Sequence, residues 1–374
     1  MNTCKKCFLP DGRLGVRLNK HGICNFCEYH QQAFSRFAAY REQELILQQK
    51  FELFKGKYEY DVLVGLSGGK DSTYVLYRMV KKYHLKVLAV TFDNGFLTDY
   101  SRRNVEDIVK HLKIDHFYYK PNWEAMKIFY RACLDKLNWP CFGCIMPGFF
   151  LAARAMLERK IPFFVHGRTP FQLFRNFYKN SSDPSIRMME LNLQNYSAKE
   201  ILRFYRKMNF NTQLFLWWLI RKKADRKMVA EKIFKVPKLD TQFVPEMISY
   251  FLFEKYDEES IKDKLEKEHI GYKRPSHDAL LGHGDCEIHE AAKILFKAKH
   301  NVIIEGLELA VMLRHGEITP EEAKKKLEQT EEDDPEKLHH SIGCLCTKLD
   351  LEPDDYNRIL HDLKHKKIKS YWKY

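Results

Sequence analysis

Two pairs of cysteines near the start of the chain form a recognisable constellation. Cys4 and Cys7 make one C-x₂-C pair, and after sixteen further residues Cys24 and Cys27 make a second. Four thiolates supplied in this way are a common ligand set for structural Zn²⁺, which they surround tetrahedrally without leaving an open position for a substrate. We therefore expect a structural zinc ribbon here rather than four unrelated buried thiols.

A further C-x₂-C pair, Cys141 and Cys144, lies in the middle of the chain and is flanked by prolines and a glycine that predict a loop. Two ligands do not complete a metal site, so a partner must come from elsewhere. Cys286 is the candidate, because its polar, glycine-bearing surroundings do not suit a core thiol. The remaining cysteines are interpreted as helical thiols, with ligation left open for the last two: Cys133, Cys344 and Cys346.

A loop rich in serine and glycine, Ser67-Gly68-Gly69-Lys70-Asp71-Ser72, follows an apolar run at 60–65 and precedes a helical pattern at 73–82. A strand, a glycine loop and a helix in this order bind anions, since the loop amides turn inward and the helix presents its positive end. The hydroxyls and the lysine add donors and charge. The loop differs from a Walker A sequence, and we predict a phosphate site of another type.

Three more apolar runs predict strands at 86–92, 114–119 and 161–165, with helical patterns between them. This alternation predicts a doubly wound parallel α/β sheet, whose ligands bind at the carboxyl ends of the strands. Asp93 directly follows the run at 86–92. We expect it either to contact a nucleotide or Mg²⁺, or only to stabilise a turn. Gly167 and Arg168 are candidates for a phosphate or adenine contact, although a surface arginine is the alternative. Asp71 either binds Mg²⁺ or caps the helix.

The elements that carry these residues belong to a chain of 374 residues with a formal charge of +13 and 45% hydrophobic residues. This composition excludes a disordered polymer and a small disulfide scaffold. No apolar run is long enough to span a membrane, and the N-terminus lacks a signal peptide, so we expect a cytoplasmic location. We expect a zinc ribbon at 1–35, an α/β domain that carries the phosphate loop at 55–195, a basic and aromatic helical insertion at 196–275, and a helical region at 276–374.

The insertion mixes Lys, Arg and aromatic residues, most densely between Lys199 and Lys238. Such a mixture is typical of RNA binding, of an amphipathic helix whose aromatics pack inward, or of contact with an anionic membrane surface. We favour the amphipathic helix, because no RNA-binding module is recognisable. The run Leu214–Ile220 fits such a helix.

The string Ser67–Ser72 resembles the pyrophosphate loop of the PP-loop ATP pyrophosphatases, which adenylate an oxygen of their substrate. The ribbon, the loop and the middle C-x₂-C pair also resemble tRNA-thiolating members that carry a three-cysteine iron–sulfur cluster. The C-terminal runs 306–323 and 351–356, with Asp334-Pro335, resemble N-acetyl sugar amidotransferases of surface-polysaccharide and nonulosonic-acid biosynthesis.

The resemblance to the amidotransferases implies an AMP-forming enzyme that binds ATP and Mg²⁺ at Ser67–Ser72, with Ser67, Lys70 and Asp71 taking part in catalysis. Its substrate would be a nucleotide-linked N-acetyl sugar, whose acetamido oxygen is replaced by ammonia to give an acetamidino group for lipopolysaccharide or flagellin glycan. Ammonia would come from a partner glutaminase subunit, since the chain shows no glutaminase domain. The alternative is a tRNA sulfurtransferase with a [4Fe–4S] cluster on Cys141, Cys144 and Cys286, although nucleic acid is the less expected partner.

Overall fold

The computed structural model describes residues 2–33, 40–174, 198–237, 242–273, 285–331 and 334–365. Contacts within the chain divide it into two compact units. Unit 1 consists of Met1–Ala39, Pro170–Met188 and Ser276–Tyr374, and unit 2 of Tyr40–Thr169 and Met189–Pro275. Each unit is thus assembled from segments that lie far apart in the sequence.

Unit 2 is built on a parallel sheet of five strands in the order β3-β2-β1-β4-β5. The strands are β1 (Val62–Gly65), β2 (Val87–Phe92), β3 (Asp115–Tyr119), β4 (Phe163–His166) and β5 (Glu246–Ser249). The first four agree with the predicted runs, and the sheet is doubly wound as expected. β1 is paired with a strand on each side, which explains why its residues are almost continuously apolar.

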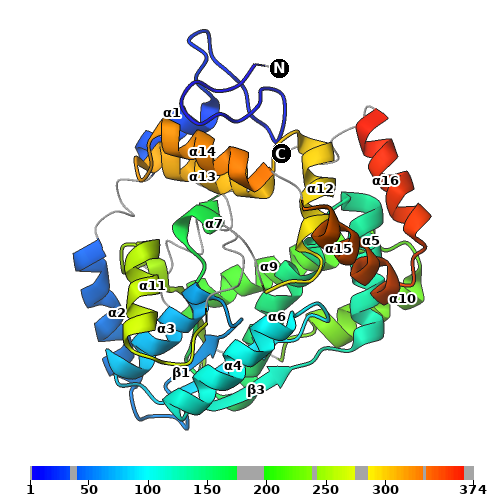
Figure 1. Ribbon diagram of the computed structural model, residues 1–374. Helices are drawn as coiled ribbons and strands as arrows, with labels where there is room; N and C mark the ends of the chain where they lie inside the picture. The colour runs from blue at the N-terminus through cyan, green and yellow to red at the C-terminus, as the bar shows by residue number, and fades with distance from the viewer. Residues whose placement is uncertain are drawn as a thin grey trace. The chain divides into compact units, whose positions relative to one another are not determined.

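Helices cover the sheet of unit 2 (Figure 1). They are α2 (Tyr40–Phe54), α3 (Lys70–Lys81), α4 (Asp99–Leu112), α5 (Trp123–Leu137), α6 (Phe142–Arg159), α9 (Ala198–Leu219), α10 (Lys223–Val229) and α11 (Glu258–Lys267), with a π-helical turn η2 (Ala230–Phe234) and a 3₁₀ turn η3 (Tyr250–Leu252). α6 packs Ala152, Ala155 and Met156 against the strand residues Leu63 and Phe164. α3 contacts β1, β2 and β4.

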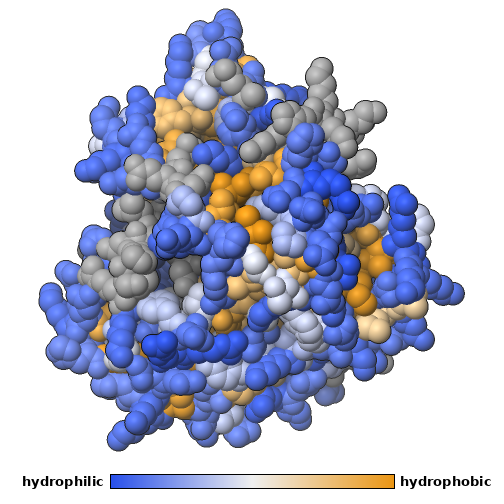
Figure 2. Space-filling model, turned by 45° about the vertical axis from the view of Figure 1, so that its right-hand side comes forward, coloured by the Kyte–Doolittle hydropathy of each residue, from blue (hydrophilic) through white to orange (hydrophobic). Residues whose placement is uncertain are grey.

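Unit 1 contains the cysteine-rich segment together with a group of helices, most of them from the C-terminal part of the chain. The helices are α1 (Asn25–Ala33), α7 (Pro170–Phe174), α12 (His289–His300), α13 (Ile304–His315), α14 (Pro320–Glu331), α15 (Pro335–Lys348) and α16 (Pro353–His365). α12 packs on α15 and α16, and α13 packs on α14 and α7. The face drawn in Figure 2 is mostly hydrophilic, with separate hydrophobic patches. Among the described residues, no helix is long and apolar enough to cross a membrane.

Three sequence expectations need correction. Cys144 lies in the first turn of α6 and Cys141 is its N-cap, so the loop predicted there is helical. Pro147 lies inside α6, where it has no N–H to donate to the Gly143 carbonyl. β5 lies within the range predicted as a helical insertion. The aromatics of α9 do not all pack inward, since the side chains of Phe210 and Trp217 are exposed.

Candidate nucleotide site and metal centres

The predicted phosphate loop lies between the carboxyl end of β1 and the first residue of α3 (Lys70). Hydrogen bonds inside the loop fix its shape. The Ser67 N–H donates to Ser72 Oγ at 3.1 Å, and this hydroxyl donates to the Gly69 carbonyl, also at 3.1 Å. The Gly69 N–H lies 3.4 Å from Ser67 Oγ. Hydrogen bonds between its own residues therefore fix the loop. The N-terminus of α3 is left to interact with an anion.

Gly68 is required by both its conformation and its surroundings. Its φ is +81°, and a Cβ atom there would lie 2.4 Å from the Ser101 carbonyl oxygen of α4. The Asn104 side-chain amide of α4 donates to the Gly68 carbonyl at 2.9 Å. α4 thus holds the loop from outside, at a separation that only glycine allows.

The segment after β4 adjoins the same loop. β1 and β4 are neighbours at the point where the strand order reverses, which is where open α/β sheets bind their ligands. A Cβ atom on Gly167 would lie 2.9 Å from the backbone of Asp71. The backbone at Gly167 therefore passes directly over the first turn of α3. The structure therefore brings Gly167 together with Ser67–Ser72.

Lys70 stands between two carboxylates. Its Nζ lies 3.5 Å from Asp71 Oδ2 and 3.5 Å from Glu258 Oε1 of α11. Asp71 Oδ1 accepts a hydrogen bond of 3.1 Å from the Tyr256 hydroxyl. Sequence reasoning missed Tyr256 and Glu258, since they lie far away in the chain and no local motif marks them.

The ionisation of this group follows from burial and charge. Burial alone would lower the pKa of Lys70, but the carboxylates of Asp71 and Glu258 reverse the effect and raise it. Burial raises the pKa of Asp71, the Lys70 ammonium opposes this, and Glu258 adds to it. The ammonium therefore stays charged, and two acidic oxygens lie beside it that suit Mg²⁺.

Asp93 follows β2 and is paired within the protein. Its two carboxylate oxygens lie 3.3 Å from the two terminal nitrogens of Arg102, and one of them accepts from the Gly95 N–H at 3.2 Å. This geometry is that of a turn-stabilising aspartate with an arginine partner. A contact of Asp93 with nucleotide or Mg²⁺ stays a prediction.

Arg168 lies at the end of β4 beside two aromatic groups. Its guanidinium carbon is 4.9 Å from the centre of the Phe149 ring, and its backbone N–H donates to His166 Nδ1 at 3.3 Å. His166 Nε2 lies 3.1 Å from Ser249 Oγ of β5. Burial, with the nearby charge of Arg168, lowers the pKa of His166 to about 3. Arg175, a further candidate contact, lies outside the described residues.

The turn that carries Cys141 and Cys144 adjoins the carboxyl end of β2. Tyr130 of α5 packs on this turn, where a Cβ atom on Gly143 would lie 2.3 Å from its ring, and its hydroxyl donates to the Asn94 carbonyl at 3.2 Å. Cys144 Sγ lies 3.2 Å from the Cys141 carbonyl. Cys286 belongs to the other unit, so the three-cysteine site stays a prediction.

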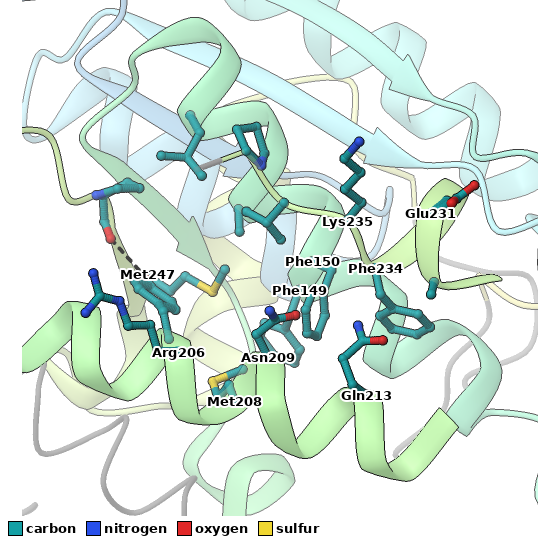
Figure 3. Close-up of a pocket in the computed structure, with 17 residues that line it drawn as sticks. Phe149, Phe150, Arg206, Met208, Asn209, Gln213, Glu231, Phe234, Lys235 and Met247 are labelled. Atoms are coloured by element: carbon teal, nitrogen blue, oxygen red, sulfur yellow. Dashed lines mark hydrogen bonds between the residues drawn. The ribbon is translucent and has the colours of Figure 1, made fainter. Parts of the chain in front are cut away.

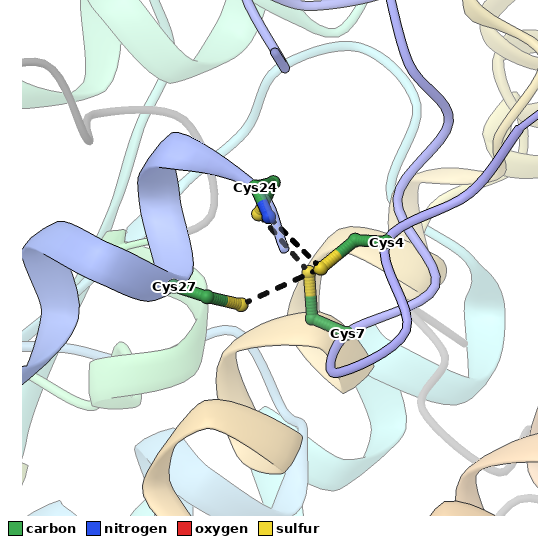
Figure 4. A group of neighbouring side chains, drawn as sticks. All are labelled: Cys4, Cys7, Cys24 and Cys27. Carbon is green, nitrogen blue, oxygen red and sulfur yellow. Dashed lines mark hydrogen bonds between the residues drawn. The ribbon is translucent and has the colours of Figure 1, made fainter. Parts of the chain in front are cut away.

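The cysteines of the predicted ribbon converge in unit 1, with their sulfur atoms pointing toward one another (Figure 4). Cys4 Sγ is 3.8 Å from Cys27 Sγ, and Cys7 Sγ is 3.6 Å from Cys24 Sγ. All four side chains are buried. Tetrahedral Zn²⁺ with Zn–S bonds of about 2.3 Å places its sulfurs about 3.8 Å apart. The cluster is therefore compatible with a zinc ribbon.

A second group of metal-ligating side chains was not foreseen as a set. Glu287, His340 and Cys344 of unit 1 bring one ligand atom each within 4.8 Å of one another. His340 Nε2 is 2.8 Å from Glu287 Oε2 and 3.4 Å from Cys344 Sγ. The spacing of His340 and Cys344 on one helix was the available signal, but Glu287 comes from another segment.

A cavity of about 490 Å³ opens in unit 2 between α6, α9, η2 and β5 (Figure 3). Apolar side chains predominate in its lining, among them Phe149, Phe234 and Met247, while Asn209 and Gln213 of α9 supply amides. Phe149 also contacts Arg168 at the end of β4. The cavity lies beside the start of β5, and its mostly apolar lining with a few polar side chains is typical of a small-molecule site.

Residues 61–134 match the model of the family described as queuosine biosynthesis protein QueC. No curated protein matches the chain. Among solved structures, the U34-tRNA thiolase NcsA from Methanococcus maripaludis with its [4Fe-4S] cluster is 17% identical, with 90% of each chain covered and a TM-score of 0.34. NMN synthetase from Francisella tularensis is 13% identical, with 79% of this chain and 94% of that one covered and a TM-score of 0.33.

The family match covers β1 to α5, which includes the phosphate loop and the first three strands. Together with the doubly wound sheet and the string Ser67–Ser72, it supports the PP-loop ATP pyrophosphatase superfamily. This class consists of ATP-dependent enzymes. The narrower family of N-acetyl sugar amidotransferases finds no support in these comparisons.

Proposed function

We propose that the protein is an ATP-dependent, AMP-forming enzyme that activates an oxygen atom of its substrate by adenylation. The observation that carries this proposal is the closed loop Ser67–Ser72 at the N-terminus of α3, next to the strand-order reversal between β1 and β4. The N–H groups in the first turn of α3 and the Lys70 ammonium offer the donors that a leaving pyrophosphate requires.

The reaction would proceed in two displacements. A carbonyl oxygen of the substrate attacks the α-phosphorus of ATP, and the bond to the bridging oxygen breaks so that pyrophosphate leaves with the electron pair. A nucleophile then attacks the activated carbon, and AMP leaves with the electron pair of the carbon–oxygen bond. Lys70 would neutralise charge that develops on pyrophosphate, and Asp71 and Glu258, whose carboxylates lie 3.5 Å from Lys70 Nζ, would hold Mg²⁺.

In the first candidate reaction the nucleophile is ammonia and the substrate is a nucleotide-linked N-acetyl sugar. Attack on the adenylated acetamido group, with loss of one proton to solvent, gives an acetamidino group. The C-terminal motifs favour this candidate. Residues 306–323 form α13 and the start of α14, and 351–356 lie at the start of α16. A glutaminase subunit would then supply the ammonia.

In the second candidate reaction a sulfur nucleophile displaces AMP from a tRNA base. The match to the queuosine biosynthesis protein QueC favours a nucleoside acceptor over a sugar, because queuosine is a nucleoside. In this reaction Cys141 and Cys144 would take part in sulfur transfer, with Cys286 as the third cysteine of a [4Fe–4S] cluster. Tyr130 packs on the turn that carries the first two and donates a hydrogen bond to the Asn94 carbonyl after β2.

One experiment with two arms separates these candidates. The protein, purified without oxygen, is incubated with Mg²⁺-ATP and ammonium plus UDP- or CMP-linked acetamido sugars, or with bulk tRNA and a sulfide donor. Mass spectrometry then detects exchange of O for NH in the sugar or of O for S in a nucleoside. AMP formation that depends on one acceptor identifies the reaction. If neither acceptor stimulates conversion of ATP to AMP, both candidates are wrong.

A further inference from the structure

Helix α9 of unit 2 exposes large apolar side chains along one face. Phe210, Leu214, Trp217 and Trp218 are 63%, 53%, 68% and 39% exposed. Their spacing of four, three and one residues places them on one side of a helix. The described residues contain only three other large hydrophobic side chains as exposed as these, Leu45, Leu53 and Met228. We call the α9 set the apolar stripe.

The opposite face of α9 holds the helix to unit 2. Leu202, Thr212, Leu216 and Leu219 are buried. Tyr205 donates a hydrogen bond of 3.0 Å to the Pro245 carbonyl just before β5. Figure 3 shows Met208, Asn209 and Gln213 of α9 beside the cavity. α9 therefore has a packed face that fixes its orientation, and the apolar stripe is a second face outside that packing.

Positive charge flanks the stripe at both ends. Arg203 and Lys207 are exposed before it, and exposed Arg221, Lys222 and Lys223 follow it. No acidic residue occurs in the sequence between Glu200 and Asp225. The surface thus combines an apolar strip of about 12 Å, at 1.5 Å per residue, with basic ends.

We propose that the apolar stripe and its basic ends bind the surface of an anionic lipid bilayer. Tryptophans suit the boundary between headgroups and acyl chains, phenylalanine and leucine enter the acyl layer, and lysine and arginine attract anionic headgroups. RNA fits less well, because Leu214 offers no ring for stacking a base. A protein partner also fits less well, because protein interfaces are depleted in lysine. The helix lies on the bilayer and does not cross it.

The test uses the full chain and vesicle flotation. Vesicles contain phosphatidylcholine either alone or with about one third phosphatidylglycerol. We expect binding to the anionic vesicles, at least several-fold weaker at high salt. The double substitution Leu214→Gln/Trp217→Gln should weaken binding about tenfold or more, because it removes two apolar anchors. The triple substitution Arg221→Gln/Lys222→Gln/Lys223→Gln should abolish the preference for anionic vesicles.

The matched control is Leu45→Gln/Leu53→Gln, which removes two leucines of α2 that are 59% and 62% exposed. This control should bind vesicles as the unaltered protein does, and circular dichroism checks that every variant folds. The proposal is overturned if no vesicle binds, or if the α2 and α9 variants lose binding equally. It is also overturned if the α9 substitutions abolish tRNA binding or self-association while vesicle binding stays unchanged. These readouts do not involve ATP and are independent of the proposed reaction.

Discussion

Lys70 is the cation that the nucleotide loop brings to the start of α3. It shares two carboxylates, Asp71 and Glu258, which keep it charged and orient it. Lys262 of α11 also pairs with Glu258, at 3.2 Å, but it does not belong to the loop. The two lysines therefore offer a matched pair of substitutions.

We expect Lys70→Ala to reduce acceptor-dependent AMP formation about 100-fold, because a donor to the leaving group is lost. Lys262→Ala should retain most of the activity, since Glu258 keeps its contact with Lys70. Steady-state AMP release with the acceptor identified above measures both. Equal activity of Lys70→Ala and the unaltered protein would rule out the role assigned to the loop.

A second prediction at the residue scale concerns the four cysteines of the predicted ribbon. Cys24→Ser should release most of the bound Zn²⁺ and expose the segment around it to proteolysis, because tetrahedral coordination supplies folding energy. Cys133→Ala is the control, since Cys133 is buried in α5 and is not one of the four ligands. Metal analysis of both variants checks this. Zinc retained in full by Cys24→Ser would exclude the tetrathiolate site.

His166 gives a prediction about pH. Its pKa is lowered to about 3, chiefly by burial, so it is neutral in the folded protein at pH 7. The unfolded chain takes up the proton near pH 6.5, and the contribution of His166 to stability is therefore lost as pH falls from about 6.5 toward 3. Between pH 7 and pH 5 this loss should be about 1–2 kcal/mol.

His166→Asn should remove that part of the pH dependence. Urea unfolding of the two proteins at pH 7 and pH 5 measures it. The informative quantity is the change with pH in each protein, because the substitution also alters packing beside Ser249. Identical changes in both proteins would show that His166 is not the group that titrates.

At the scale of elements, α3, α4 and the segment after β4 together form the candidate phosphate site. α4 approaches the loop so closely that Gly68 has no space for a side chain. Gly56 also has a positive φ, +72°, but a Cβ atom there would have no neighbouring atom within 4 Å and would lie in open space. Substitutions at these two glycines therefore separate the free-energy cost of the backbone conformation from the cost of steric crowding.

Gly68→Ala should weaken binding of Mg²⁺-ATP about tenfold or more, because α4 and the loop must move apart. Gly56→Ala carries a similar backbone cost of about 1 kcal/mol but should leave ATP affinity unchanged. Isothermal titration calorimetry measures the affinities, and urea unfolding measures the stabilities. Comparable ATP affinity in both variants would contradict the constraint assigned to α4.

At the scale of the whole molecule, each unit carries its own candidate ligand site. The four-cysteine cluster lies in unit 1, and the nucleotide loop lies in unit 2. A ligand that binds only the folded form of a unit stabilises that unit. In scanning calorimetry we expect two unfolding transitions, of which Mg²⁺-ATP raises one and a zinc chelator lowers the other.

Substitutions assign those transitions. Lys70→Ala should reduce the shift caused by ATP without altering the chelator effect, and Cys24→Ser should do the reverse. A single transition that responds equally to both ligands would contradict the assignment of one ligand to each unit.

The sequence by itself determined the features that depend only on residues close together in the chain. The string Ser67–Ser72 specifies strand, loop and helix, because glycines and an apolar run act locally. The two C-x₂-C pairs predict a cluster, because their ligand spacing is set by short turns. The first four strands were predictable for the same reason, since each is an apolar run with helical patterns between.

Tertiary structure alone decided what distant segments contribute. Glu258 reaches Lys70, and Tyr256 reaches Asp71, from almost two hundred residues away. β5 is only four residues long and gains its partner from β4, so its own sequence carries little signal. The turn at Cys144 is helical although Pro147 follows it in the same helix, and this helix packs on α5. Local sequence patterns determine the secondary-structure elements. Burial and long-range contacts determine which side chains contact one another and which, like Trp217, remain exposed to solvent.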